Sequence, residues 1–376
     1  MWLLLSTCRR WYRNLPGKKI RCRPVPVSIF IVDDSPAIRK IIGGILARNY
    51  GFKLVGTARN GQEALEQIPK VKPDVVILDV EMPVLDGLST LKRLMRSYPV
   101  PVLMLSAHTC EGSSVAIDAL ANGAVDFVLK PTQSTGLNAM VDELVAKIEA
   151  AAAADISKAA GLPPEKKLRR DKPAGIVLPR QRVQLIVIGC STGGPAALRV
   201  ILPSLPPDFK VPVLVVQHMP AGFTASLAEN LDARCALRVK HAADGDMVKW
   251  GGVLIAPSGK RFALQRKTSG VHCVVRECRG PLKPGSFCPS VDEVMTSAAE
   301  IYGSQTCGVV LTGMGRDGLE GMRAIKAANG LTIAQDESTC VVYGMPKAVV
   351  DAGLADNVIP LPQIGPTLVQ IVEKML

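Results

Sequence analysis

Short apolar runs alternate with amphipathic stretches along residues 27–150. The apolar runs predict five strands, at 27–32, 52–57, 74–78, 102–106 and 125–129. Residues at helical spacing predict the helices between and after them, at 35–49, 61–68, 87–96, 112–122 and from about 137. Strands that are apolar throughout, rather than at every second position, are typical of parallel sheets covered on both faces. The pattern therefore predicts an α/β domain with a five-stranded, doubly wound parallel sheet.

The alternation of apolar runs and amphipathic stretches stops at residues 151–183 and resumes at residue 184. Alanines and then a Gly-Leu-Pro-Pro sequence lead into a charged segment, so we interpret 151–183 as a flexible linker between domains. Residues 184–376 predict a second, mainly parallel α/β domain. Its expected strands lie at 184–188, 213–217, 307–311 and 331–335. Its expected helices start at 195, 290 and 316, a β-rich insertion fills 236–276, and a last element spans 361–374.

The formal charge of +12 is concentrated outside both predicted domains. The N-terminal extension, residues 1–26, carries seven basic and no acidic residues, and the linker carries eight basic against three acidic residues. Together they account for the whole excess. Because a nucleic-acid-binding domain needs its positive charge on a folded surface, this distribution argues against nucleic acid as a partner. We interpret the excess as solvated charge, with weak attraction to an acidic surface as the alternative.

The remaining composition points to a cytoplasmic protein. No apolar run approaches the roughly 18 residues of a membrane span, so no membrane insertion is expected. The apolar residues 1–5 are too few for the core of a signal peptide. Ten cysteines without a C-x-x-C pair, and only four histidines, contain no zinc-ligand spacing. Reduced thiols are therefore expected.

Polar residues follow the predicted strands of the first domain. Asp33 and Asp34 follow the first strand, Asp79 the third, Ser106 ends the fourth and Lys130 follows the fifth. Ligands of open α/β sheets bind at the carboxyl ends of the strands, so these side chains should converge. Clustered carboxylates repel one another and favour Mg²⁺, and a carboxylate beside a metal and a lysine can attack a phosphoryl group. The alternative is that strand-end acids such as Asp34 cap helices.

At these positions, residues 27–150 resemble the receiver domain of response regulators, which has a flavodoxin-like fold. The resemblance implies that Asp79 accepts a phosphoryl group and also holds Mg²⁺ together with Asp33 and Asp34. The residues that it implies for phosphoryl contact and switching are Ser106, Lys130 and the aromatic Phe127.

The second domain contains a possible nucleophile, base and orienting acid. Ser191 lies in the G-x-S-x-G turn at 189–193, His218 directly follows a predicted strand, and Asp317 lies in a glycine-rich turn after another. A serine becomes nucleophilic when a base takes its proton and a third group orients that base. The order Ser, His, Asp differs from the Ser, Asp, His order of α/β-hydrolases, which excludes that fold. The alternative is that Ser191 and Asp317 cap helices and that the histidine is structural.

Several stretches of the second domain resemble the catalytic domain of chemotaxis-type protein-glutamate methylesterases. The matching stretches are 189–195, 217–220, 255–257, 289–292, 311–318 and 335–346. The resemblance implies Ser191 as nucleophile, His218 as general base and then acid, and Asp317 as its orienting group. It also implies an oxyanion site formed by backbone amides near Thr192 and Met314.

The two resemblances together imply a phosphorylation-activated hydrolase. It would demethylate glutamate methyl esters of chemoreceptors and deamidate receptor glutamines, with a chemotaxis-type histidine kinase as phosphodonor. Mg²⁺ is expected at the phosphorylation site, and no cofactor is expected for the esterase reaction. The protein is expected to be a monomer. Two rivals remain. One is a non-catalytic regulator whose second domain only binds a receptor or kinase, and the other is a DNA-binding regulator that uses the basic linker.

Overall fold

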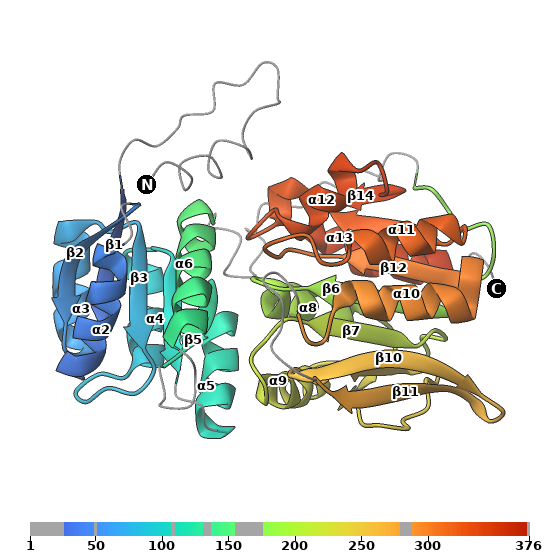
Figure 1. The fold of residues 1–376 in the computed structure, drawn as a ribbon, viewed down its shortest axis with the longest axis horizontal. Coiled ribbons are helices and arrows are strands. Elements are labelled where there is room, and N and C mark those ends of the chain that lie inside the picture. Colours follow the sequence, from blue (N-terminus) through green and yellow to red (C-terminus); the bar gives the residue numbers. More distant parts are fainter. Residues whose placement is uncertain are drawn as a thin grey trace, which may run out of the picture.

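The computed structural model describes residues 26–48, 51–106, 110–130, 137–154, 176–278 and 287–373. Two α/β units lie side by side, and the chain passes from one to the other once (Figure 1). Nearly all of the predicted N-terminal extension, residues 1–25, lies outside the described residues.

The first unit contains a five-stranded parallel sheet with the order β2-β1-β3-β4-β5. Its strands are β1 (Val27–Val32), β2 (Phe52–Ala58), β3 (Val75–Asp79), β4 (Val102–Ser106) and β5 (Asp126–Leu129). Its helices are α2 (Pro36–Ala47), α3 (Gly61–Val71), α4 (Gly87–Ser97), α5 (Cys110–Ala121) and α6 (Leu137–Ala153). This strand order is the flavodoxin-like one, so the expected fold is confirmed.

Polar side chains at the strand-to-helix turns begin three of these helices. The side chains of Ser35, Asn60 and Asp86 each accept a hydrogen bond from a backbone N–H in the first turn of α2, α3 and α4. Such caps satisfy N–H groups that the helix itself leaves unpaired. Ser35, and not Asp34, caps α2, which leaves the Asp34 carboxylate available for another role.

The second unit contains a seven-stranded parallel sheet with the order β14-β13-β12-β6-β7-β9-β8. Its strands are β6 (Leu185–Cys190), β7 (Val213–Gln217), β8 (Arg238–His241), β9 (Gly252–Ile255), β12 (Thr306–Val310), β13 (Leu331–Gln335) and β14 (Asn357–Ile359). Its helices are α8 (Gly194–Ile201), α9 (Phe223–Asp232), α10 (Val291–Tyr302), α11 (Leu319–Ala327), α12 (Met345–Asp351) and α13 (Leu361–Glu373). Short 3₁₀ turns lie at Leu202–Ser204, Gly303–Gln305 and Glu337–Thr339. The mainly parallel α/β fold is confirmed.

The predicted β-rich insertion at 236–276 divides into two parts. Strands β8 and β9 extend the parallel sheet, whereas β10 (Lys260–Lys267) and β11 (Gly270–Glu277) form a separate antiparallel hairpin. The buried residues of the hairpin belong to the same apolar cluster as those of α10, and β10 packs against that helix.

Each sheet has a point at which successive strands are added in opposite directions. In the first sheet this point lies between β1 and β3, and in the second it lies between β6 and β12. Loops that leave such neighbouring strands diverge, which opens a crevice at their carboxyl ends. The loops after β1, β6 and β12 carry Asp33, Ser191 and Asp317, and Asp79 is the last residue of β3.

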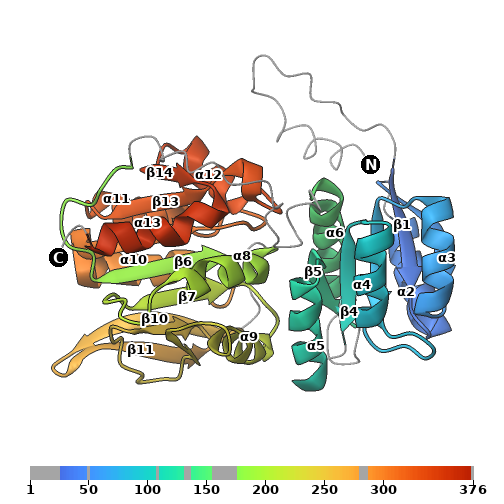
Figure 2. The same ribbon diagram turned by 180° about the vertical axis from the view of Figure 1, so that it is seen from behind.

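The two units are in direct contact. Helix α5 packs against α8 and α9, as both views show (Figure 2). The ring of Phe127 from β5 stacks on Phe223 from α9, with 4.5 Å between ring centroids. Asn230 of α9 donates a hydrogen bond to the Asp118 carboxylate of α5 at 3.4 Å. A single apolar cluster therefore continues from one unit into the other.

The predicted linker, residues 151–183, is described at its two ends. The first end belongs to the first unit, and the second end contacts the second unit. Helix α6 continues to Ala153. The Asn357 side chain bonds the backbone N–H and carbonyl of Val177 at 2.8 and 3.0 Å. Ser304 donates a hydrogen bond to Gln181 at 2.8 Å. Residues 155–175, between these ends, lie outside the described residues, and none of the described helices is long and apolar enough to cross a membrane.

Candidate functional site

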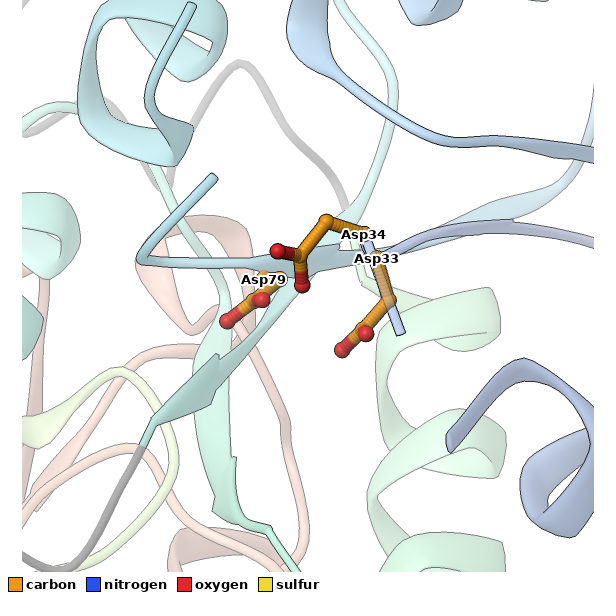
Figure 3. A group of neighbouring side chains, drawn as sticks. All are labelled: Asp33, Asp34 and Asp79. Atoms are coloured by element: carbon orange, nitrogen blue, oxygen red, sulfur yellow. The ribbon is translucent and has the colours of Figure 1, made fainter. Parts of the chain in front are cut away.

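Three carboxylates gather at the carboxyl end of the first sheet (Figure 3). Asp33 and Asp34 follow β1, and Asp79 is the last residue of β3. Oxygen atoms from the three side chains all lie within 4.8 Å of one another. Asp33 and Asp79 are buried, whereas Asp34 is exposed. The first sheet therefore brings together the three acids that the sequence placed at these strand ends.

Lys130 neutralises only part of this negative charge. Its Nζ lies 2.6 Å from Asp79 Oδ2 and 3.3 Å from Asp33 Oδ2. Burial raises the pKa of Asp79 to about 6; the Asp33 charge adds to this rise, and Lys130 opposes it. Burial lowers the pKa of Lys130, but the hydrogen bond to Asp79 and the charges of both acids outweigh it, so the pKa is raised. Lys130 is thus a permanent cation facing two buried acids.

The donor set fits a divalent cation. Asp33 Oδ2 is buried and accepts no hydrogen bond, and Lys130 Nζ lies 3.3 Å from it, which leaves this oxygen able to bind a further cation. Oxygen ligands from carboxylates are those that Mg²⁺ prefers. Ser106, at the end of β4, is buried beside this cluster's strands, and Phe127, two strands from β3, is buried against Phe223 of the second unit.

Ser191 and His218 leave neighbouring strands at the same level. Cys190 of β6 is paired with Gln217 of β7, and Ser191 and His218 are the next residues. The Ser191 N–H donates a hydrogen bond to the Thr312 carbonyl at 3.1 Å, and the His218 N–H donates to the Cys190 carbonyl at 3.0 Å. The loops after β6, β7 and β12 therefore meet around Ser191.

His218 is held by a buried carboxylate. Its Nε2 lies 2.8 Å from Asp317 Oδ2, and both side chains are almost fully buried. Asp317 also accepts hydrogen bonds from four other donors. These are Ser290 Oγ at 2.9 Å, Val291 N at 2.8 Å, Asp292 N at 3.0 Å and Gly318 N at 3.1 Å. Burial raises the pKa of Asp317, but the hydrogen bond and charge of His218 and the backbone donors outweigh it, and the pKa falls to about 2.

Neither Ser191 nor Asp317 caps the helix that follows it in the sequence. Helix α8 is preceded by Gly193 and helix α11 by Gly318, and neither N-cap position has a side-chain hydrogen bond. Both glycines have positive φ angles, of 79° and 99°, which a residue with a side chain adopts only with strain. The capping alternative therefore does not account for Ser191, whereas Asp317 accepts hydrogen bonds from the first two N–H groups of α10 in addition to its contact with His218.

The serine and histidine are near each other but are not hydrogen-bonded. Within the described part of the chain, the Ser191 hydroxyl has no hydrogen-bond partner, and His218 Nδ1 is buried without one. Hydrogen bonds between catalytic groups often tighten only when substrate is bound. Because Nε2 faces Asp317, Nδ1 is the nitrogen left for the serine.

The backbone N–H groups of Thr192 and Met314 have no acceptor among the described residues. Met314 lies in the loop after β12, whose Gly313 is so close to Ser191 that an added Cβ would lie 2.8 Å from the serine Cβ. The Thr192 side chain, in contrast, is engaged by the first unit: its hydroxyl donates a hydrogen bond to Asp126 Oδ2 at 2.5 Å.

An aromatic residue that the sequence analysis did not single out covers the histidine. The Phe287 ring stacks on the His218 ring with 3.9 Å between centroids and 8° between planes. The neighbouring Cys288 is disulfide-bonded to Cys278, which corrects the expectation of reduced thiols at these two positions. Neither contact has a local signal in the sequence, since a ten-residue separation between cysteines predicts no pairing.

Both units match known proteins. A family model described as CheB methylesterase matches residues 186–368, and one described as response regulator receiver domain matches residues 29–142. A relative from Carboxydothermus hydrogenoformans, named protein-glutamate methylesterase/protein-glutamine glutaminase 1, is 48% identical over 347 residues, which cover 90% of this chain and 96% of the relative. A relative from Symbiobacterium thermophilum, named protein-glutamate methylesterase/protein-glutamine glutaminase, is 45% identical over 363 residues. These residues cover 93% of this chain and 98% of the relative.

Solved structures also match part of this chain. The crystal structure of the Thermotoga maritima CheB methylesterase catalytic domain is 45% identical to this chain, with a TM-score of 0.49. The match covers 50% of this chain and 99% of that chain.

Asp317→Asn should destabilise the protein in a pH-dependent way. The pKa of Asp317 is lower in the folded state, about 2, than its ordinary value of 3.8, so its charge stabilises the fold above pH 4. The shift corresponds to about 2 kcal/mol, which is lost as the pH falls from 4 towards 2. Urea unfolding should therefore give a difference between wild type and variant that is largest at pH 5–7 and shrinks below pH 4. Asp208→Asn, at an exposed turn, should show no such difference; a gap that stays constant with pH would contradict the assignment.

Proposed function

This chain belongs to the family of protein-glutamate methylesterases/protein-glutamine glutaminases, and we propose that it hydrolyses glutamate methyl esters of chemoreceptors under the control of its receiver unit. The observation that carries the proposal is His218, whose Nε2 is held by the buried Asp317 while its Nδ1 has no partner beside Ser191. A serine nucleophile requires a histidine that is oriented by a carboxylate at one ring nitrogen and can accept the serine proton at the other.

In the first half of the reaction, Ser191 Oγ attacks the carbonyl carbon of the ester while His218 Nδ1 takes its proton. The negative charge that develops on the carbonyl oxygen is stabilised by the backbone N–H groups of Thr192 and Met314, each worth roughly 10²–10³-fold in rate. His218 then gives the proton to the departing methoxide, so that methanol leaves and an acyl-serine remains. Asp317 stabilises the imidazolium without itself being protonated, in keeping with its pKa of about 2.

In the second half, water attacks the acyl-serine and His218 takes its proton. The proton returns to Ser191 Oγ as the glutamate carboxylate is released. A receptor glutamine follows the same course, with ammonia as the leaving group in place of methanol. Because the donors for the oxyanion come from the backbone, their position depends on the loops rather than on particular side chains at 192 and 314.

We further propose that Asp79 accepts a phosphoryl group from a chemotaxis-type histidine kinase. Asp33, Asp34 and Asp79 would hold Mg²⁺, which neutralises charge on the transferred group when it is bound. Lys130 already contacts the Asp79 carboxylate and would pair with the phosphoryl oxygens, and Ser106 lies at the end of the adjacent strand. Because we propose chemoreceptors as substrates and a chemotaxis-type histidine kinase as phosphodonor, we also propose that the protein acts in the cytoplasm.

The contacts between the units support a restraining role for the unphosphorylated receiver. Asp126 of β5 bonds the hydroxyl of Thr192, whose N–H is a proposed oxyanion donor, and the adjacent Phe127 stacks on Phe223. Lys147 lies 3.4 Å from Asp126 and donates a hydrogen bond to the Phe127 carbonyl at 2.6 Å. Phosphorylation would draw Ser106 towards Asp79 and move Lys130 from the carboxylate to the phosphoryl oxygens, which shifts β5 and Phe127 and weakens these contacts.

Ser191→Ala should abolish methanol release from methylated receptor while leaving the protein folded. The change removes one oxygen that makes no hydrogen bond in the described structure, so the melting temperature should stay within a few degrees of wild type. A folded variant with near-normal turnover would eliminate Ser191 as the nucleophile. Loss of activity also excludes the non-catalytic regulator, because only a catalyst releases methanol.

Asp79→Asn should keep the full chain at its basal activity when a phosphoryl donor such as acetyl phosphate is added with Mg²⁺. The amide cannot form the acyl phosphate, although it is similar in size to the carboxylate. The wild type should be activated under the same conditions. Equal activation of both proteins would show that another residue carries the phosphoryl group.

Asp126→Ala should raise the basal activity of the unphosphorylated chain by about tenfold. A hydrogen bond to a charged group contributes about 1.5–3 kcal/mol, and 1.4 kcal/mol corresponds to a tenfold change in population. Asp142→Ala, on the exposed face of α6, is the matched control and should leave the basal rate unchanged. An unchanged or lower basal rate in the Asp126 variant would mean that this contact does not restrain the site.

A further inference from the structure

Gln217 lies between the two residues that carry the proposed chemistry and bonds to both. It is the last residue of β7 and is only 1% exposed. Its Nε2 donates one hydrogen bond to the Ser191 carbonyl at 3.0 Å and another to the His218 carbonyl at 2.9 Å. A carboxamide nitrogen has two hydrogens, so one is available for each carbonyl. The loops after β6 and β7 are thus joined by a single buried side chain.

The oxygen of the same carboxamide is fixed as well. Gln217 Oε1 accepts a hydrogen bond from the Cys190 thiol at 3.1 Å. Burial raises the pKa of this thiol, which keeps it protonated and able to donate. Because each end of the amide has its partner, only one orientation of the side chain satisfies all three hydrogen bonds.

The backbone around Gln217 is shaped to admit the carboxamide. Gly194 is the first residue of α8, and a Cβ added there would lie 2.1 Å from Gln217 Oε1. Gly194 does not have a positive φ angle, so the glycine is required by this close approach rather than by its backbone conformation. A glycine is thus needed at position 194 because the Gln217 carboxamide occupies the space of a Cβ.

We propose that Gln217 is a positioning residue that sets the distance between the Ser191 hydroxyl and His218 Nδ1. The inference rests on the proposed function. Ser191 and His218 have no hydrogen bond to each other in the described structure, so their separation depends on how their backbones are held. Gln217 bonds the carbonyl of each, and none of its side-chain hydrogen bonds in the described structure is to the Ser191 hydroxyl or the His218 ring. Its loss should therefore change the alignment of nucleophile and base, not the binding of substrate.

The test is Gln217→Met in the full chain, assayed for methanol release from methylated receptor after activation with acetyl phosphate and Mg²⁺. Methionine has a similar length and no hydrogen-bonding amide. Misplacement of reacting groups by about 1 Å costs up to 10²-fold in rate, so kcat per folded molecule should fall about 10- to 100-fold with KM unchanged. The folded fraction is measured by circular dichroism, so that loss of stability is separated from loss of turnover.

Gly194→Ala supplies a second variant if Gln217→Met does not fold. The new Cβ displaces the carboxamide without removing it, and the same fall in kcat at unchanged KM is expected. Asn357→Leu is the matched control, because Asn357 is also a buried carboxamide (7% exposed) that bonds two backbone groups, on the edge strand β14. It should lower the melting temperature and leave kcat unchanged.

Three outcomes would overturn the inference: a folded Gln217→Met or Gly194→Ala protein with near-normal kcat, a fall confined to KM, or an equal fall in kcat for Asn357→Leu. Ser191→Ala is assayed in parallel to separate this inference from the proposed function. If Ser191→Ala is inactive while Gln217→Met is fully active, only the positioning role is wrong. If Ser191→Ala is active, the proposed function itself fails.

Discussion

A parallel sheet buried on both faces leaves its strand ends as the main place for polar chemistry, and both proposed sites depend on this constraint. Every residue of β3, β4, β6 and β7 is buried. The side chains within these strands are mostly apolar and fill the two layers between sheet and helices. Asp33, Ser191 and His218 follow directly after their strands, and Asp79 ends β3. The switch points of the two sheets then bring residues that are distant in the sequence into one crevice.

Three buried side-chain polar atoms lack a hydrogen bond among the described residues. They are Asp33 Oδ2, His218 Nδ1 and Asn230 Oδ1. The first faces the proposed cation, the second faces the proposed nucleophile, and the third lies on α9, where the receiver packs. An unsatisfied buried polar group costs about 1–3 kcal/mol, so a further partner at His218 Nδ1 or Asn230 Oδ1 would be favourable. Asp33 Oδ2 already has Lys130 Nζ at 3.3 Å. In contrast, Asp317 and Gln217 are fully bonded, as suits groups that hold others in place.

The interface between the units connects these two kinds of site. Lys130, directly after β5, contacts the acidic cluster, and Asp126 and Phe127 within β5 contact the second unit. A change in the position of β5 would therefore alter the contacts with the acidic cluster and those with the second unit together. The Asp126–Thr192 hydrogen bond reaches the residue after Ser191, and the Phe127–Phe223 stack lies on α9. Both contacts support the proposed effect of Asp79 phosphorylation on the esterase loop.

The sequence by itself determined the two α/β folds and most of their strands, because a buried parallel strand is a continuous apolar run and needs no knowledge of its neighbours. The runs at 27–32, 102–106, 213–217 and 331–335 match β1, β4, β7 and β13 in their full extent. Short elements such as β14 and α12 lack a long apolar period and were not predicted. The candidate residues at strand ends were found for the same local reason. Only the tertiary structure decided which nitrogen of His218 faces Asp317, that Phe287 covers its ring, that Gln217 joins two loops, and that Asp126 reaches Thr192. Each of these contacts joins segments from different strands or units, and their distances depend on how the packed layers meet.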